Sequence, residues 1–292
     1  CFLFGFLVQV PCSSPAAELN VYVSILPQKA FVQAIGGDHI QVQVMVQPGA
    51  NPATYEPKPS QLACLADSRI YFAIGVPFEK AWLKRFRSVQ PKLQVVHIEK
   101  NIPKIAMPSA YQLDPGQNQR TTGQNRQTQG KDPHIWLSPP LVKTLAQNIC
   151  RALAKADPEQ AMAYKKNLTA FLHDIESLDA DLQDMLTPFH GHAFLVFHPA
   201  WGYFARTYDL RQVAVEMEGK SPKPQQLARL IAFARKENIQ AIFVQPQFSA
   251  KSARTIAREI GAEVITADPL AEDWAANLRR QTKILSQVLA DR

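Results

Sequence analysis

Three side chains in this sequence can bind a metal ion and lie in a proline-rich segment or at the end of an apolar run. His134 lies in the segment KDPHIWLSPP, where prolines and Trp136 restrict the chain around the imidazole. His198 ends the apolar run AFLVFH, and Asp268 follows AEVITA at the start of the segment DPL. Two imidazoles and one carboxylate suit a borderline divalent ion such as zinc or manganese. A single histidine near prolines is more often a loop residue without a ligand. Whether these three residues bind a metal therefore depends on where the surrounding helices and strands place them.

Short β-rich runs alternate with helical patterns along most of the chain. NVYVSI, QVQVMVQ, IYFAIG and LQVVHI form the first series, and AFLVFH, RQVAVEM, AIFVQP and AEVITA form the second. This alternation is typical of right-handed βαβ units on a parallel sheet. Open α/β sheets bind ligands beyond the carboxyl ends of their strands. We therefore expect His134, His198 and Asp268 to meet at the mouth between two lobes.

The pattern predicts an α/β fold in which two lobes, each with a parallel four-stranded sheet flanked by helices, are joined by one long rigid helix. The expected boundaries are 18–156 for the N-terminal lobe, 157–187 for the helix and 188–292 for the C-terminal lobe. Asp157 is the expected N-cap and Pro158 the first helical residue, followed by apolar residues at helical spacing. At ~1.5 Å per residue this helix would measure about 45 Å and act as a strut.

Residues 1–17, CFLFGFLVQVPCSSPAA, resemble the remainder of a secretory signal, because an apolar run precedes small residues. A run of about nine apolar residues is too short to span a bilayer. We expect an exported, periplasmic protein whose mature chain begins near Ala17 or Glu18. A lipid anchor on Cys12 is less favoured, because the residues before it make a poor attachment motif. A buried N-terminal strand or helix is the alternative.

The composition is that of a globular protein with room for two domains, since 46% of the 292 residues are hydrophobic and 20% are charged. The net charge of +7 comes from Lys and Arg scattered through helical segments. Because no basic, aromatic-interleaved stripe is present, nucleic acid is not an expected partner. We expect a monomer with core thiols at Cys64 and Cys150, and a bridge between the two is left open. Residues 109–130, rich in Gln, Asn and Gly, predict a surface loop.

Five motifs resemble one known family in their order and separation. They are PGANPATYEPKPS, DPHIWLSP, FHPAWGYFA, VQPQFSAKSA and ADPL. From about Leu19 to the C-terminus the chain resembles the solute-binding proteins of zinc/manganese ABC importers, which are periplasmic receptors built from two lobes and one long helix. The resemblance implies that His134, His198 and Asp268 bind the ion and that a membrane permease is the partner. It also implies that Trp136 and the prolines hold His134 ready for binding.

One departure from the family pattern affects the expected site directly. The family motif PHxYEP places a metal-binding histidine after the proline, whereas this chain has Ala53 at that position. The fourth ligand would then be water, Glu56 or another histidine, for which His39 and His97 are weak candidates. Gln245 is a second departure, because related sequences often have Glu there.

Three function classes remain open at this point. A receptor that captures zinc, or as a second choice manganese, and delivers it to an ABC importer is the preferred interpretation. A metal-dependent hydrolase would use the same two histidines and carboxylate, but the sequence identifies no general base or oxyanion donors. A metal-free, adhesin-like relative is supported only by Ala53. We expect His173 to be a surface residue, and His190 and His192 to lie in a solvated loop.

Overall fold

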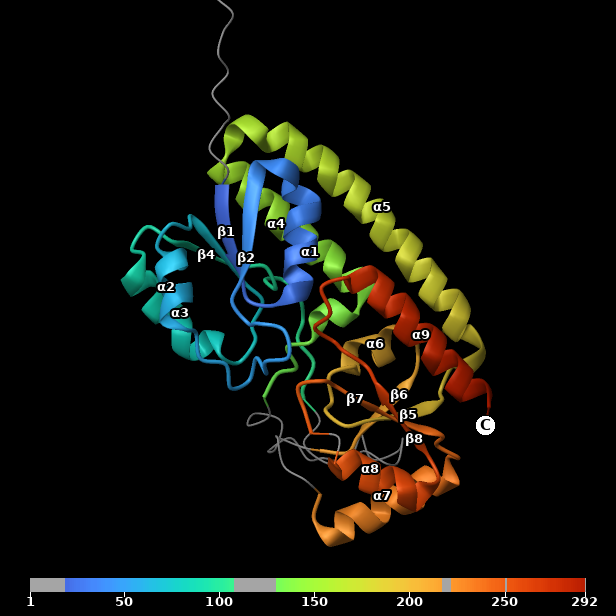
Figure 1. Ribbon diagram of the computed structural model, residues 1–292. Helices are drawn as coiled ribbons and strands as arrows, with labels where there is room; N and C mark the ends of the chain where they lie inside the picture. Colours follow the sequence, from blue (N-terminus) through green and yellow to red (C-terminus); the bar gives the residue numbers. More distant parts are fainter. Residues whose placement is uncertain (1–18, 108–129, 217–221, 250, 292) are drawn as a thin grey trace, which may run out of the picture.

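The computed structural model describes residues 19–107, 130–216, 222–249 and 251–291, which form two α/β lobes and a long helix along one side (Figure 1). The signal segment predicted at residues 1–17 lies outside these ranges, and so does nearly all of the loop predicted at 109–130. Within the described ranges, none of the helices has the length and apolar character needed to cross a membrane.

The N-terminal lobe is built on a parallel sheet with the strand order β2-β1-β3-β4. Its strands are β1 (Leu19–Val23), β2 (Ile40–Val44), β3 (Ile70–Ala73) and β4 (Gln94–His97). Helices α1 (Leu26–Gly36) and α4 (Pro139–Ala156) pack together on one side, while α2 (Pro59–Leu65) and α3 (Glu79–Val89) pack together on the other (Figure 1). Because both faces are covered, every residue of β3 is buried, as its uninterrupted apolar sequence requires.

The C-terminal lobe repeats this strand order as β6-β5-β7-β8, again with parallel pairing. Its strands are β5 (Ala193–Val196), β6 (Arg211–Ala214), β7 (Ala241–Val244) and β8 (Glu263–Thr266). Its helices are α6 (Gly202–Thr207), α7 (Pro224–Lys236), α8 (Lys251–Ile260) and α9 (Trp274–Ala290). The two similar halves predicted from the sequence are therefore confirmed.

Helix α5 (Ala161–Leu186) connects the lobes and packs against α1, α4 and α9 (Figure 1). Its 26 residues give a length of about 39 Å at ~1.5 Å per residue. It starts later than predicted, because residues Pro158–Gln160 form a 3₁₀ turn. Asp157 does not cap the helix, since its Oδ2 accepts a hydrogen bond from the Tyr164 hydroxyl at 2.9 Å instead.

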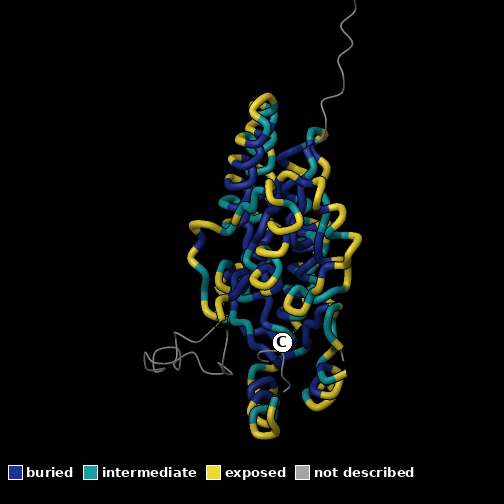
Figure 2. The backbone as a smooth tube through the Cα atoms, turned by 90° about the vertical axis from the view of Figure 1, so that its left-hand side faces the viewer, coloured by how far each residue is buried: buried dark blue, intermediate teal, exposed yellow. Residues whose placement is uncertain are grey.

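The apolar core is continuous through the middle of the molecule. One cluster of buried residues extends from the N-terminal sheet through α4, α5 and α9 to one face of the C-terminal sheet, and a second cluster covers the opposite face of that sheet. The strand β5 alternates between them, with Phe194 and Val196 in the first cluster and Leu195 in the second. Figure 2 shows buried residues in the interior and exposed residues at the tips of the outer helices and loops.

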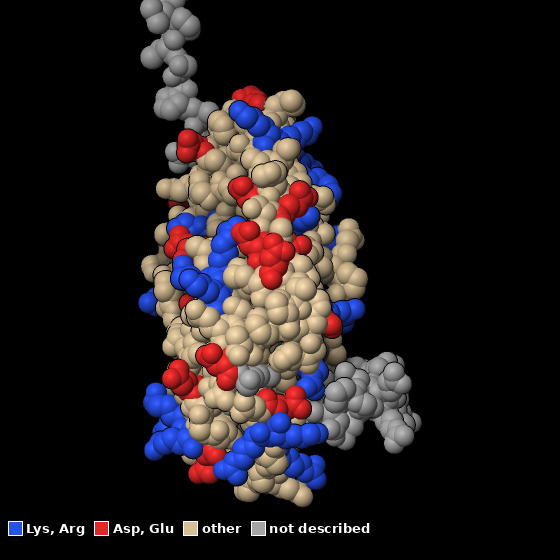
Figure 3. Space-filling view, turned by 90° about the vertical axis from the view of Figure 1, so that its right-hand side faces the viewer, with Lys and Arg blue, Asp and Glu red and all other residues tan. Residues whose placement is uncertain are grey.

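The distribution of charged side chains and the burial of the two cysteines were both predicted from the sequence. In the view of Figure 3, Lys and Arg side chains gather toward the end of the C-terminal lobe and are otherwise mixed with acidic and uncharged ones. Cys150 is buried and free, as expected of a core thiol. Cys64 is exposed and free, so its prediction as a core thiol was wrong. Its helix α2 is short, and only Leu65 on that helix is buried.

Candidate metal-binding site

Asp132 holds both the backbone and the imidazole of His134 in place. His134 directly precedes the 3₁₀ turn Ile135–Leu137, and only 9% of its surface is exposed. The fully buried Asp132 accepts two hydrogen bonds on its Oδ1, from the backbone N–H of His134 at 2.9 Å and from the imidazole Nδ1 at 2.7 Å. A proton on Nδ1 leaves Nε2 with a free lone pair, which is the state that binds a metal ion.

His198 lies just beyond the carboxyl end of β5, as the sequence predicts. Its Nδ1 donates to Glu216 Oε1 at 2.5 Å, so its Nε2 is also left free. The side chain of Gln245 fixes the backbone of His198, accepting from its N–H at 3.3 Å and donating to its carbonyl at 2.8 Å. The ring of Phe248 stacks on the imidazole at a centroid distance of 4.8 Å.

The two imidazoles face a common space between the lobes. Their ring centroids are 5.4 Å apart and their planes are inclined by 73°. This separation is close to the value of about 5 Å expected for two imidazoles on one tetrahedral zinc ion with Zn–N bonds of ~2.0 Å. Burial lowers the pKa of His198; the hydrogen bond to Glu216 opposes this shift, and the neighbouring His134 adds to it. The neutral, metal-binding form of His198 is therefore favoured.

Asp132 and Glu216 are functional candidates that the sequence reasoning missed. Both are buried carboxylates, and each accepts from Nδ1 of one histidine. A carboxylate behind a histidine is a common arrangement around metal ions, because it orients the ring and makes Nε2 more basic. In the sequence, the signal for Asp132 was its position two residues before His134 in DPH. The signal for Glu216 was its position two residues after β6, a strand whose last two residues are buried.

Asp268 follows β8 as predicted, but the structure does not bring it to the two histidines. Its Oδ1 accepts from Gln247 Nε2 at 3.0 Å and from the backbone N–H of Leu270 at 2.9 Å. Among the residues that the structure describes, no three His, Cys, Asp or Glu side chains lie close enough together to hold a metal ion. Asp268 lines a smaller adjoining cavity, and Gln247 and Leu270 line both cavities.

The histidines line an inter-lobe cavity of about 410 Å³ together with Ala53 and Trp136. Other lining residues are Val76, Pro77, Met107, Lys131 and Phe248. Ala53 of the PATYEP segment therefore lines the same cavity as the two histidines. Glu56 is exposed and does not line this cavity, so the structure gives it no role as a substitute ligand.

The remaining histidines are elsewhere. His39 contacts the ring of Tyr164 at a centroid distance of 6.1 Å, and His97 Nδ1 lies 3.1 Å from Glu99 Oε1. His173 and His190 are exposed, and His192 is half-buried. None of these five residues lines the inter-lobe cavity.

Trp136 joins the two lobes beside His134. It is almost fully buried, and its ring centroid lies 5.2 Å from that of His134. Its indole N–H donates to the carbonyl of Pro269 at 2.7 Å, and the indole N–H of Trp274 donates back to the carbonyl of Trp136 at 2.7 Å. These reciprocal bonds, here called the indole pair, link the DPHIW and DPL motifs directly.

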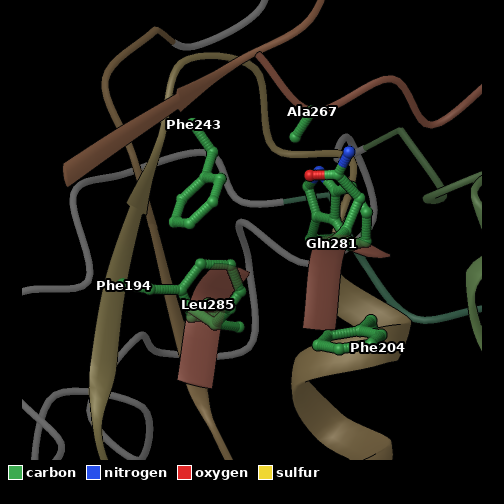
Figure 4. Close-up of a pocket in the computed structure, with 7 residues that line it drawn as sticks. Phe194, Phe204, Phe243, Ala267, Gln281 and Leu285 are labelled. Carbon is green, nitrogen blue, oxygen red and sulfur yellow. The ribbon is translucent and has the colours of Figure 1, made fainter. Parts of the chain in front are cut away.

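A separate hollow lies inside the C-terminal lobe and takes no part in this site. It is lined by apolar side chains from β5, β7, α6 and α9, with Gln281 on α9 at its edge (Figure 4). Gln281 Oε1 is buried and has no hydrogen-bond partner in the described structure. The hollow has no titratable lining residue, so it offers no metal ligand.

Comparison with known proteins decides the family. The family model described as "Zinc-uptake complex component A periplasmic" matches residues 21–288, which is most of the chain. The chain belongs to this family. As a member of the zinc-uptake component A family, it is a periplasmic metal-binding receptor for an ABC importer and is not an enzyme.

Individual relatives agree with this assignment. The high-affinity zinc uptake system protein ZnuA of Bacillus subtilis is 27% identical over 256 residues, which cover 86% of this chain and 78% of that protein. A crystal structure of ZnuA is 39% identical with a TM-score of 0.84, over 93% of this chain and 99% of that one. The laminin-binding protein Lmb of Streptococcus agalactiae, described as having adhesin and metal transporting activity, is 25% identical with a TM-score of 0.79, over 93% and 99% of the two chains.

Proposed function

We propose that the protein captures zinc in the inter-lobe cavity through Nε2 of His134 and His198 and delivers it to the membrane permease of an ABC importer. The observation that supports this most is the pair of imidazoles 5.4 Å apart, each with Nδ1 bonded to a buried carboxylate. Such a pair is preorganised, so little conformational entropy is lost when the ion binds. Zinc is preferred over manganese, because imidazole nitrogen suits zinc whereas manganese favours oxygen ligands.

Asp268 is proposed as the third protein ligand. In the described structure its carboxylate is satisfied by Gln247 and by the backbone of Leu270, in a cavity that adjoins the inter-lobe cavity. Zinc would have to compete with the hydrogen bond from Gln247, and a divalent cation is a stronger partner for a carboxylate than a neutral amide. The two histidines thus form the fixed part of the site and Asp268 the movable part.

The metal-free interpretation rests on Ala53 alone. A relative that had abandoned metal would have no need to keep two imidazoles in one cavity, each oriented by its own buried carboxylate. Maintaining buried ionisable groups is costly in the absence of a function. The retained arrangement therefore favours a working metal receptor with one ligand fewer on the N-terminal lobe.

A zinc titration against a competing chelator tests the ligand set. His134→Ala and His198→Ala are each expected to weaken zinc binding by at least tenfold, and Asp268→Asn by a smaller factor, because each ligand lost is replaced at best by water. His173→Ala is the matched control, since this histidine is exposed on α5. Zinc should also raise the melting temperature of the parent more than that of the ligand variants. Equal affinities in the parent and both histidine variants would contradict the proposal.

A further inference from the structure

The inter-lobe cavity is far larger than a metal ion needs. Its volume is about 410 Å³, whereas a water molecule occupies ~30 Å³ of liquid volume. Cavities of ~300–1,000 Å³ are typical of sites for small organic ligands. Besides His134 and His198, much of the lining is apolar, including Val76, Pro77 and Met107. A bare ion would leave most of this apolar surface without a partner.

The two histidines would fill only part of the coordination sphere of a zinc ion. Zinc in proteins usually takes about four ligands, and in the described structure two imidazoles line the cavity. The carboxylate of Glu216 also lines it but is engaged by Nδ1 of His198, and among the described residues no group of three His, Cys, Asp or Glu side chains is placed to hold an ion. The side chain of Ala53, which lines the same cavity, offers no donor atom. While Asp268 keeps its bonds to Gln247 and Leu270, two positions on the ion are open to donors that the described residues do not supply.

One positive charge lies among the described residues that line this cavity. Lys131 lines it and is exposed, and within the described part of the chain its ammonium makes no ion pair. Among the described residues that line the cavity, Glu216 is the one acidic side chain, and it is already bonded to His198. The free ammonium group therefore favours an anionic occupant, and a carboxylate is the simplest group that both pairs with lysine and binds zinc.

We propose that the receptor takes up zinc as a complex with a small organic chelator, which binds the ion through a carboxylate and one further donor and packs its apolar part in the inter-lobe cavity. This inference rests on the proposed function and names the form of its cargo. In this chelate-loaded form Asp268 keeps its bonds to Gln247 and Leu270, and the chelator's two donors take the positions on zinc left by His134 and His198. The chelator's carboxylate lies within reach of Lys131, and its apolar part covers Val76, Pro77 and Phe248.

Equilibrium dialysis with labelled chelators tests the inference. The probes are picolinate, L-histidine and citrate, each with and without zinc, and nicotinate serves as the isomer of picolinate that cannot form the chelate ring. We expect the protein to retain picolinate one-to-one when zinc is present and to retain none without zinc, and to retain no nicotinate in either case. In the same assay zinc alone should bind to the protein.

Variants locate the bound chelator. Lys131→Met should reduce zinc-dependent retention of picolinate about tenfold through loss of the charged contact, whereas Lys236→Met, which removes an exposed lysine of α7, should leave it unchanged. Ala53→His should bind zinc more tightly and lose picolinate, because the added imidazole takes an open position. If zinc binds and none of the three chelators is retained with it, this inference is wrong and the proposed function stands. If zinc itself does not bind, the proposed function is wrong.

Discussion

The carboxylate behind His198 offers the sharpest test of the metal site, because it acts on the ion without touching it. Glu216 is 3% exposed, and its Oε1 lies 2.5 Å from Nδ1 of His198. A hydrogen bond to a charged group contributes about 1.5–3 kcal/mol, and ~1.4 kcal/mol corresponds to a tenfold change in affinity. Glu216→Ala should therefore weaken zinc binding about 10- to 100-fold, the range typical of such supporting carboxylates.

Glu216→Gln should have a zinc affinity between those of the parent and of Glu216→Ala. Glutamine keeps an acceptor but loses the charge, so the bond to Nδ1 is about half as strong and the loss of zinc affinity should be about fivefold. Competition titration with a fluorescent zinc chelator measures all three proteins, and urea unfolding of the metal-free forms separates binding from stability. Asp179→Asn is the control, because Asp179 accepts a hydrogen bond from Tyr208 away from the cavity. Zinc affinities within twofold across the series would refute the role assigned to Glu216.

Three further predictions follow from individual positions. Ala53→His should raise zinc affinity by about tenfold at about pH 8 and by less at about pH 6, where a proton competes for an imidazole with an ordinary pKa of ~6.5; chelator competition at both pH values checks this. Burial raises the pKa of Glu79 to about 7, so the free energy of unfolding should fall as pH rises from about 4.5 toward 7, and urea unfolding should show a flatter profile for Glu79→Gln. Gly202→Ala would place a Cβ 2.9 Å from Asp132 Oδ2, and the displaced carboxylate should lower zinc affinity about tenfold in the same titration.

The strands were the part of the fold that the sequence predicted best. Runs such as IYFA and AFLV are uninterrupted and apolar, because both faces of their sheets are covered, and they stand between clear helical patterns. The beginning of α5 was less predictable, because the Asp157 carboxylate has a partner seven residues further on, the Tyr164 hydroxyl, that competes with the capping role. Local rules describe caps well only where no such partner exists.

At the site, sequence reasoning located the histidines but not their surroundings. His198 could be placed because parallel strands end at one edge of a sheet, and His134 because its motif is distinctive. Glu216 could not be assigned, since its contact with His198 spans 18 residues and depends on the pairing of β6 with β5. The hydrogen bond from Gln247 to Asp268 is equally nonlocal, since its partners are 21 positions apart in the sequence.

The indole pair has a consequence for the rate at which cargo leaves. Trp136 and Trp274 each donate a hydrogen bond across the lobe boundary at 2.7 Å, and both bonds are buried. Swinging the lobes apart would break both at once and expose two indole rings to water, so spontaneous wide opening is a rare event. On the proposed function, we expect rapid emptying only when a docking partner pulls on both lobes, so that release coincides with arrival at the permease.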